Sequence, residues 1–251
     1  MLRRLLRWGA VLELPECKRL IGILDEMEFK QSKPRTVILT YDHAVAIIAR
    51  ANETGRPSIA LAQALQFETA LRQRDVIGEW EPGEEKPSSG IMLTSPNGRR
   101  NRRWANGLTW SHIGSDGVLR KTTTKTAAAI EVPVSLCPLV EQEIAQTPIE
   151  RRVGPMIVNE RTGLPYTQNT FRTVWREIAE AAGIPKSVWN MDSRAGSITE
   201  ATDAGADLEK ARHHAGHRNA SMTARYSRKT LEKTAEVARL RMEHRRKKKG
   251  P

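Results

Sequence analysis

The second half of the chain is a close succession of helix-forming segments, and this pattern constrains the fold more than any other feature. From Leu136 onward, apolar residues recur at the spacing of one helix face, between Gly and Pro residues that end each segment. Helices are expected over residues 137–146, 168–182, 193–204, 207–214, 219–226 and 230–247. No stretch reaches the roughly 18 apolar residues that a membrane span needs. This half of the chain therefore predicts a mainly helical domain.

The first half combines short helices with β signals. Helices are expected over residues 2–8, 14–29, 41–51, 57–69 and 74–79, with Thr40 as the cap of the third. Strands are expected at residues 91–94, 108–113, 118–119 and 130–134. The stretch 108–113 alternates and precedes Gly-Ser-Asp-Gly, which favours a hairpin. Together these patterns predict an α+β fold, mainly helical, with a small antiparallel β-sheet.

Positive charge is concentrated at the C-terminal end. The chain carries a formal net charge of +12, and residues 225–249 alone contain eleven Lys or Arg against three Glu. A second cluster reads Arg-Arg-Asn-Arg-Arg over residues 99–103. Such blocks fit a polyanion partner, because each phosphate contact releases counterions, although a lysine-rich tail can also be a solvated end. Charge alone therefore suggests nucleic acid without establishing it.

The cysteines and the N-terminus bear on the compartment. Cys17 and Cys137 lie far apart without metal-site spacing, and we interpret them as reduced thiols. The basic, apolar start at residues 1–8 lacks the long apolar stretch and cleavage site of a signal peptide, so we interpret it as an amphipathic helix. We therefore expect a cytoplasmic protein that is not inserted in a membrane.

One segment near the C-terminus has a spacing that points to chemistry. Residues 215–226 read Ala-Gly-His-Arg-Asn-Ala-Ser-Met-Thr-Ala-Arg-Tyr, so Tyr226 follows His217 by nine residues. Upstream, residues 192–206 read Asp-Ser-Arg-Ala-Gly-Ser-Ile-Thr-Glu-Ala-Thr-Asp-Ala-Gly-Ala. From about residue 39 to 227 the chain resembles the tyrosine recombinases of the phage integrase type. In that family a His-x-x-Arg segment opens a helix, and a Gly-His pair precedes the nucleophilic Tyr by the same interval.

The resemblance implies a set of catalytic residues, namely Arg72, Lys125, Arg194, His217 and Tyr226. The family's first arginine follows a short apolar helix and precedes an acidic residue by three positions, as Arg72 precedes Asp75; Arg74 is the alternative. The family's lysine lies in a β-hairpin turn before a strand that ends in proline. Lys125 fits this pattern, and Lys121 is a weaker candidate because it lies earlier in the preceding strand.

These residue types suit attack on a DNA phosphodiester. Two arginines can present planar forks of donors to the non-bridging oxygens and stabilise the added charge of the transition state. Tyr226 would attack phosphorus and form a 3′-phosphotyrosine, which conserves the bond energy for rejoining. Lys125 would protonate the departing 5′ oxygen, and His217 would hydrogen-bond a non-bridging oxygen. The resemblance implies no cofactor and no metal.

Met191 departs from the family pattern. It stands where the family usually has the His of His-x-x-Arg, a residue assigned proton transfer near the tyrosine, and methionine cannot exchange a proton. Two interpretations remain open: an active site-specific recombinase of a prophage or integrative element, and a catalytically impaired DNA-binding protein with the same fold. A type IB topoisomerase-like nicking-closing enzyme would share the chemistry, but the tail after Tyr226 favours a recombinase.

The resemblance also suggests a division of the chain. Residues 1–36 would be a remnant of the core-binding helical region plus a linker, 37–227 the catalytic domain, and 228–251 a basic C-terminal helix. In the family such a C-terminal segment packs on a neighbouring protomer, which implies a homotetramer on double-stranded DNA. The alternative is a helix that folds back on its own domain or stays loose.

Four further side chains keep open interpretations. Arg172 and Arg176 lie four residues apart on the face of helix 168–182 that does not carry its apolar residues, where they could meet phosphates or water. His213 and His214 are expected on a helix surface.

Overall fold

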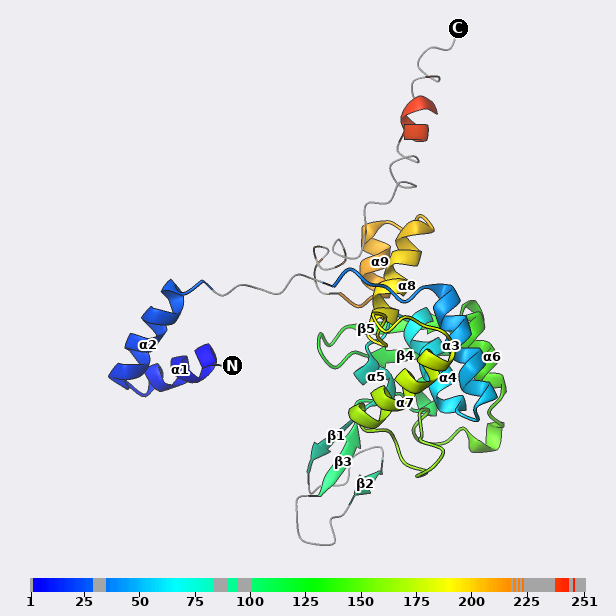
Figure 1. Ribbon diagram of the computed structural model, residues 1–251, viewed down its shortest axis with the longest axis horizontal. Helices are drawn as coiled ribbons and strands as arrows, with labels where there is room; N and C mark the ends of the chain where they lie inside the picture. Colours follow the sequence, from blue (N-terminus) through cyan, green and yellow to red (C-terminus); the bar gives the residue numbers. More distant parts are fainter. Residues whose placement is uncertain are drawn as a thin grey trace. The chain divides into compact units, whose positions relative to one another are not determined.

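The computed structural model describes residues 2–28, 35–83, 90–93, 101–217, 219, 221, 223, 238–243 and 246 (Figure 1). The chain forms two compact units, Met1–Thr36 and Val37–Pro251. The first unit is a pair of helices, α1 (Leu2–Val11) and α2 (Pro15–Glu26), which pack against each other. Among the described residues, no helix has both the length and the apolar character to cross a bilayer.

The second unit contains most of the described secondary structure. Its α-helices are α3 (Tyr41–Glu53), α4 (Pro57–Glu68), α5 (Gln73–Ile77), α6 (Pro138–Ala145), α7 (Gln168–Ala181), α8 (Asp192–Asp203) and α9 (Leu208–His214). Its strands are β1 (Glu79–Pro82), β2 (Met92–Leu93), β3 (Arg102–Ala105), β4 (Val118–Thr122) and β5 (Ala129–Pro133). Short 3-10 turns occur at η1 (Trp110–His112), η2 (Val134–Leu136) and η3 (Ile149–Arg151).

Helix α4 forms the centre of this unit. Pro57 occupies its first turn, where no backbone donor is needed, and every residue from Ser58 to Phe67 is buried. The helix packs against α3, α6, α7 and α8, so it has no solvent-facing side and correspondingly little amphipathic character. Buried residues of α4 include Gln63 and Gln66, whose polar side chains need partners inside the core.

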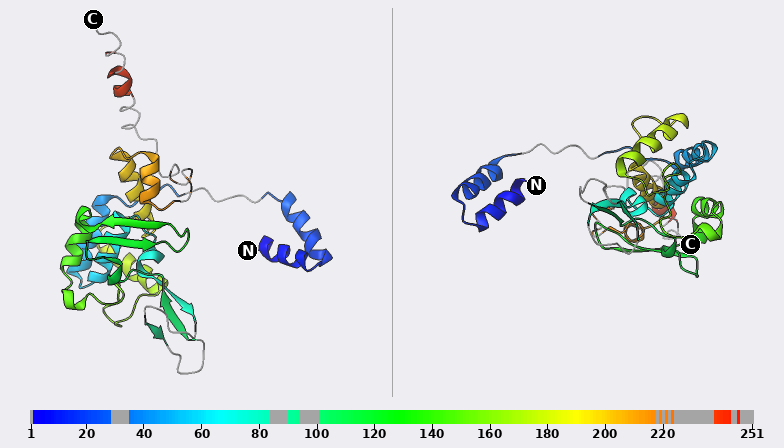
Figure 2. Two further views of the ribbon diagram at one scale, coloured as in Figure 1. Left: turned by 180° about the vertical axis from the view of Figure 1, so that it is seen from behind. Right: turned by 90° about the horizontal axis from the view of Figure 1, so that it is seen from below.

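The strands form two separate antiparallel sheets rather than the single sheet that we expected. One is a three-stranded sheet in the order β1-β3-β2, and the other is the β4–β5 hairpin. The three-stranded sheet lies at the end of the unit opposite α8 and α9 (Figure 1 and Figure 2). Two of its strands, β1 and β3, escaped prediction because Glu-Trp-Glu-Pro and Arg-Arg-Trp-Ala are too rich in charge to resemble strands.

The three-stranded sheet is fastened to the end of α5 by one tryptophan. Glu79 pairs with Ala105, so the chain leaves and returns at the same place. Trp104 is buried, and its indole Nε1 donates to the Ile77 carbonyl over 3.0 Å. A Cβ on Gly78 would lie 2.4 Å from Nε1 of Trp104, so this position, with φ +76°, requires glycine.

The segment 108–113 is not the strand that its alternation predicted. It forms η1, in which Nδ1 of His112 accepts from the Thr109 N–H over 3.0 Å. Only isolated β-bridges remain at its ends among the described residues, Thr109 with Pro155 and Ile113 with Leu119. Local side-chain capping therefore overrides the alternating pattern.

The other helix predictions agree with the structure to within a few residues where the structure describes them. Thr40 caps α3 by accepting from the His43 N–H over 3.2 Å, as expected. The α+β class, mainly helical, is also correct. The helix expected over residues 219–226 and most of that over 230–247 lie outside the described residues, and residues 238–243 are helical.

Candidate active site

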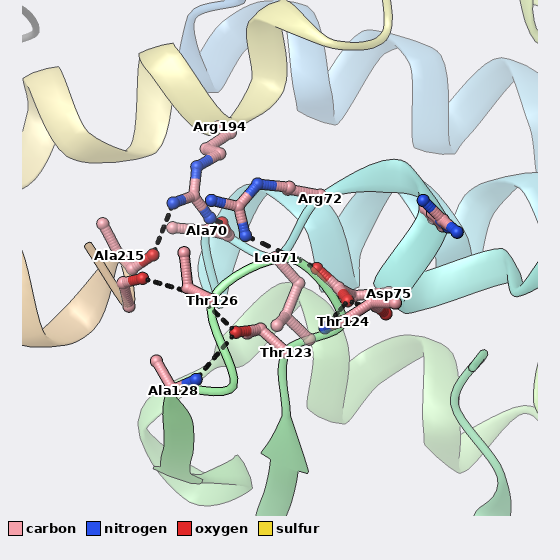
Figure 3. Close-up of polar contacts among 12 residues, drawn as sticks. Ala70, Leu71, Arg72, Asp75, Thr123, Thr124, Thr126, Ala128, Arg194 and Ala215 are labelled. Atoms are coloured by element: carbon pink, nitrogen blue, oxygen red, sulfur yellow. Dashed lines mark hydrogen bonds and ion pairs between the residues drawn. The ribbon is translucent and has the colours of Figure 1, made fainter. Parts of the chain in front are cut away.

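Arg72 and Arg194 come from distant segments and lie side by side (Figure 3). Arg72 immediately precedes α5 with an extended backbone, so its side chain leaves the helix axis. Arg194 lies in the first turn of α8 and is buried, with a relative exposure of 8%. In the view of Figure 3, both guanidinium groups lie above the turn that joins β4 to β5.

Two backbone carbonyls fix the guanidinium of Arg194. Its Nη1 donates to the Ala70 carbonyl and its Nη2 to the Ala215 carbonyl, each over 2.5 Å. These carbonyls follow α4 and α9, respectively, so one side chain ties three helices together. A planar, permanently charged fork is suited to this task, whereas a lysine could not reach both oxygens in one plane.

His217 lies within the electrostatic reach of both arginines. It is buried, and its Nδ1 lies 2.9 Å from Oγ1 of Thr223. Burial, then the charge of Arg194 and then that of Arg72, lower the pKa of His217 to about 4. The imidazole is therefore neutral near pH 7, and the two arginines supply the positive charge of the site.

The turn between β4 and β5 presents Lys125 to solvent. Oδ1 of the buried Asp75 accepts from both the backbone N–H and the hydroxyl of Thr124, each over 2.7 Å. On the other side of the turn, Oγ1 of Thr126 donates to the Gly216 carbonyl over 3.2 Å. The turn is thus hydrogen-bonded to α5, which follows Arg72, and to the segment after α9, which contains His217 and whose Ala215 carbonyl accepts from Arg194.

Asp75 also faces Arg72. Its Oδ2 lies 3.8 Å from Nη1 of Arg72, and the carboxylate is 1% exposed. One buried carboxylate therefore faces the first arginine with one oxygen and holds the lysine-bearing turn with the other. The sequence marked Asp75 only as the acidic residue of a pattern and gave no sign that Thr124 would be its hydrogen-bond partner.

The rival candidates are placed differently. Arg74 is exposed and donates through Nε to Oε1 of Glu79 over 2.5 Å. Lys121 is buried and donates to the Gly107 carbonyl over 3.1 Å, and burial lowers its pKa. Both side chains therefore have structural partners away from the arginine pair.

The expected nucleophile, Tyr226, lies outside the described residues. Met191 directly precedes α8 and its side chain is exposed, at 61%. Of the two adjacent histidines, His213 is exposed as expected, whereas His214 is partly buried with Nε2 3.2 Å from Oγ of Ser197. The pKa of His214 is lowered by burial and by Arg194.

A buried amide network behind the arginines escaped prediction. Asn190 and Gln66 form a reciprocal pair, with N···O distances of 2.9 and 3.1 Å, and Gln73 donates to the same Asn190 oxygen over 2.9 Å. The available signal was the presence of two glutamines, Gln63 and Gln66, in the otherwise apolar α4. The network joins α4, the residue after Arg72 and the residue before Met191.

Comparison with known proteins gives both a family and a fold. The phage integrase family matches residues 103–233, a range that contains the positions of Lys125, Arg194, His217 and Tyr226 and begins after Arg72. No curated protein sequence matches the chain.

Several solved structures are similar at low sequence identity. A lambda integrase dimer bound to a COC′ core site is 19% identical with a TM-score of 0.57, covering 79% of this chain and 49% of that one. XerA recombinase is 14% identical with a TM-score of 0.53, and the match covers 87% of this chain and 67% of that one. Tn1549 transposon integrase in complex with a circular intermediate DNA is 14% identical with a TM-score of 0.58, and the match covers 87% of this chain and 70% of that one.

These likenesses establish a shared fold. The chain spans about half the length of the lambda integrase chain that it matches. The family match is independent of the fold comparison and extends over more than half of the sequence. This chain therefore belongs to the phage integrase family.

Proposed function

We propose that this protein cuts and rejoins double-stranded DNA through a covalent 3′-phosphotyrosine at Tyr226. The observation that most supports this is that Arg72 and Arg194, from distant segments, lie close together (Figure 3), and that the charges of both act on the buried His217. Such concentrated positive charge beside a neutral hydrogen-bonding ring suits a phosphodiester better than any neutral ligand.

The arginines would hold the scissile phosphate. Arg194 is anchored by two carbonyls, so its guanidinium need not reorganise when charge develops on the phosphoryl oxygens, and Arg72 faces the Asp75 carboxylate at 3.8 Å. His217 is neutral near pH 7 and can donate a hydrogen bond to a non-bridging oxygen. In the tautomer in which Nδ1 accepts from the Thr223 hydroxyl, Nε2 carries the proton that this hydrogen bond to substrate would use.

The proposed cleavage step exchanges one bond to phosphorus for another and moves two protons. The Tyr226 hydroxyl releases its proton to water, and its oxygen forms a bond to phosphorus while the bond from phosphorus to the 5′ oxygen breaks. The exposed ammonium of Lys125, on its clamped turn, gives a proton to that oxygen. Rejoining reverses these steps when a 5′ hydroxyl attacks the phosphotyrosine, so no external energy source is required.

The wider setting of the reaction is also proposed. Residues 37–227 would form the catalytic domain, residues 1–36 the end of a core-binding region, and the basic residues 228–251 a contact to a neighbouring protomer. A homotetramer on DNA would fit these parts, and the similar lambda integrase has been observed as a tetramer bound to a Holliday junction. We place this activity in the cytoplasm, where it would integrate or excise a prophage or another mobile element.

A covalent-adduct assay tests the proposal. The protein is incubated with a pool of nicked duplexes of randomised sequence. Cleavage next to the nick releases a short fragment that bears the 5′ hydroxyl, and its loss prevents rejoining. The products are separated on a denaturing gel. We expect an adduct that carries DNA, that a protease releases and that Tyr226→Phe abolishes. Binding of the same pool without an adduct would instead support the impaired DNA-binding interpretation that Met191 suggests.

A further inference from the structure

A groove of about 430 Å³ opens between α7 and the loop that leads into α8. It is lined by Trp189, Asn190 and Met191 of that loop, by Arg172, Trp175 and Arg176 of α7, and by Gln73. Its volume is typical of preformed small-molecule sites, roughly 300–1,000 Å³. The groove is therefore large enough for one flat heterocycle.

Two large apolar side chains face solvent at this groove. Trp189 is 50% exposed and Met191 is 61% exposed, whereas most of the described aromatic side chains in the second unit are buried. An indole face and a polarisable thioether favour stacking on a planar ring. Arg172 is exposed beside them, so an anionic ligand with an aromatic part would find a complementary surface.

The groove is rigid before any ligand binds. Asn190 is fixed by the amide groups of Gln66 and Gln73, as described above. Arg176 donates to the Val188 carbonyl over 2.8 Å and to the Ile184 carbonyl over 3.1 Å, so it holds the loop from the α7 side. A ligand would therefore bind without paying to order the loop.

The position of the groove identifies what could enter it. Gln73 directly follows Arg72, and Met191 lies three residues before Arg194. The groove thus adjoins the arginine pair proposed to hold the scissile phosphate. An occupant that is part of the substrate would therefore be a group near that phosphate.

We propose that this groove binds a nucleobase that has left the DNA stack next to the scissile phosphate, with Trp189 as its stacking platform. The proposal rests on the proposed strand cleavage and adds a ligand site to it. Exchange of strands between duplexes requires bases beside the break to separate from their old partners, which costs a few kcal/mol per base. A preformed stacking site lowers this cost. Met191, which cannot transfer a proton, would serve as an apolar wall of the same site.

The test is a cycle that combines protein variants with altered DNA. A Tyr226→Phe background prevents cleavage, so that only binding is measured, by fluorescence anisotropy at one fixed salt concentration on duplexes selected from the randomised pool. An abasic nucleotide is then placed at each position of the bound duplex in turn. The protein variants are Trp189→Ala, Trp189→Phe and, as a matched control, Leu136→Ala, whose side chain is 75% exposed outside the groove.

We expect one position at which the abasic nucleotide weakens binding about tenfold. Trp189→Ala should weaken binding of the intact duplex by a similar factor and show no further loss at that position, whereas Trp189→Phe should retain most of the affinity. Removing the opposite base should strengthen wild-type binding, because the captured base no longer has to be unpaired. Leu136→Ala should behave like the parent protein.

The proposal is overturned if the losses from Trp189→Ala and from abasic nucleotides are independent at every position, or if Leu136→Ala loses as much affinity. Unfolding midpoints of the variants exclude a folding defect, and Trp189→Phe provides a second, milder change. Since the cycle needs no cleavage, an absent covalent adduct together with a coupled cycle would remove the proposed chemistry and leave the base site standing.

Discussion

Asp75 accepts two hydrogen bonds from Thr124 through a single oxygen, and thereby fastens the lysine-bearing turn to the segment that begins with Arg72. Because the other carboxylate oxygen faces Arg72, this residue couples the orientation of the two cationic groups. A change at Asp75 should therefore disturb both groups, although Asp75 itself would not touch the substrate.

Asp75→Ala should slow adduct formation by about 100-fold, because the general-acid contribution of a positioned side chain is about 10²–10⁴-fold. The loss should be smaller for Asp75→Asn, which keeps an acceptor for Thr124. The measurement is the rate of adduct formation on the selected nicked duplex.

A substrate with sulfur in place of the 5′-bridging oxygen separates the two effects of Asp75. A thiolate leaves without protonation, so this substrate should restore most of the rate of Lys125→Ala and only part of that of Asp75→Ala. Equal restoration of the two variants would mean that Asp75 acts on the lysine alone.

The arginine pair should respond unequally to lysine substitution. Arg194→Lys removes a buried fork that bonds to the Ala70 and Ala215 carbonyls, so both stability and activity should fall. We expect a loss of about 1–3 kcal/mol in the free energy of unfolding and at least about 100-fold in adduct rate. Arg72→Lys should lose adduct rate with little change in the unfolding midpoint. An Arg194→Lys protein as stable as wild type would contradict the role given to these carbonyl contacts.

His217 should make the protein less stable in mild acid. Its pKa is lowered from 6.5 to about 4, so the unfolded chain takes up a proton below pH 6.5 that the folded chain excludes until the pH falls to about 4. Stability is therefore lost as the pH decreases through this interval, by at most about 3 kcal/mol, and is unaffected above it.

Urea unfolding at pH 7 and at pH 4.5 checks this expectation. His217→Asn, which keeps a polar group near Thr223, should lose less stability between the two pH values than wild type. His214 titrates in both proteins and so cancels in the comparison. An identical pH dependence in both proteins would show that the imidazole is not held neutral.

Restoring the family's histidine at position 191 should accelerate cleavage. Met191→His would supply a group that exchanges protons near the tyrosine, and we expect adduct formation to rise by about tenfold or more. Met191→Leu is the matched control, since it alters the side chain without adding a titratable group. If the histidine variant is no faster than the leucine variant, the proton does not pass through this position.

The sequence predicted the helices well because their apolar spacing and caps are local, as at Thr40. It failed at Leu108–Ile113, where a histidine cap outweighed alternation, and at the charged strands β1 and β3, where Trp104 packs on Gly78. Their stability comes from a tertiary contact that no window of sequence contains.

The site shows the same division. Its spacing indicated Arg72 and Arg194, and the structure brings these two side chains together, while the assignment of catalytic roles stays a prediction. The supports of the site could not be predicted, because the partners of Asp75 and Asn190 lie 49 and 124 residues away along the chain.

The pairing of Glu79 with Ala105 has a consequence for the history of this chain. The chain leaves the helical part at Glu79 and returns to it at Ala105, beside the buried Trp104. The segment between these residues can change in length at an entropic cost that grows only logarithmically with the number of residues. The segment between these two residues can therefore vary while Arg72 and Lys125 keep their separation in space.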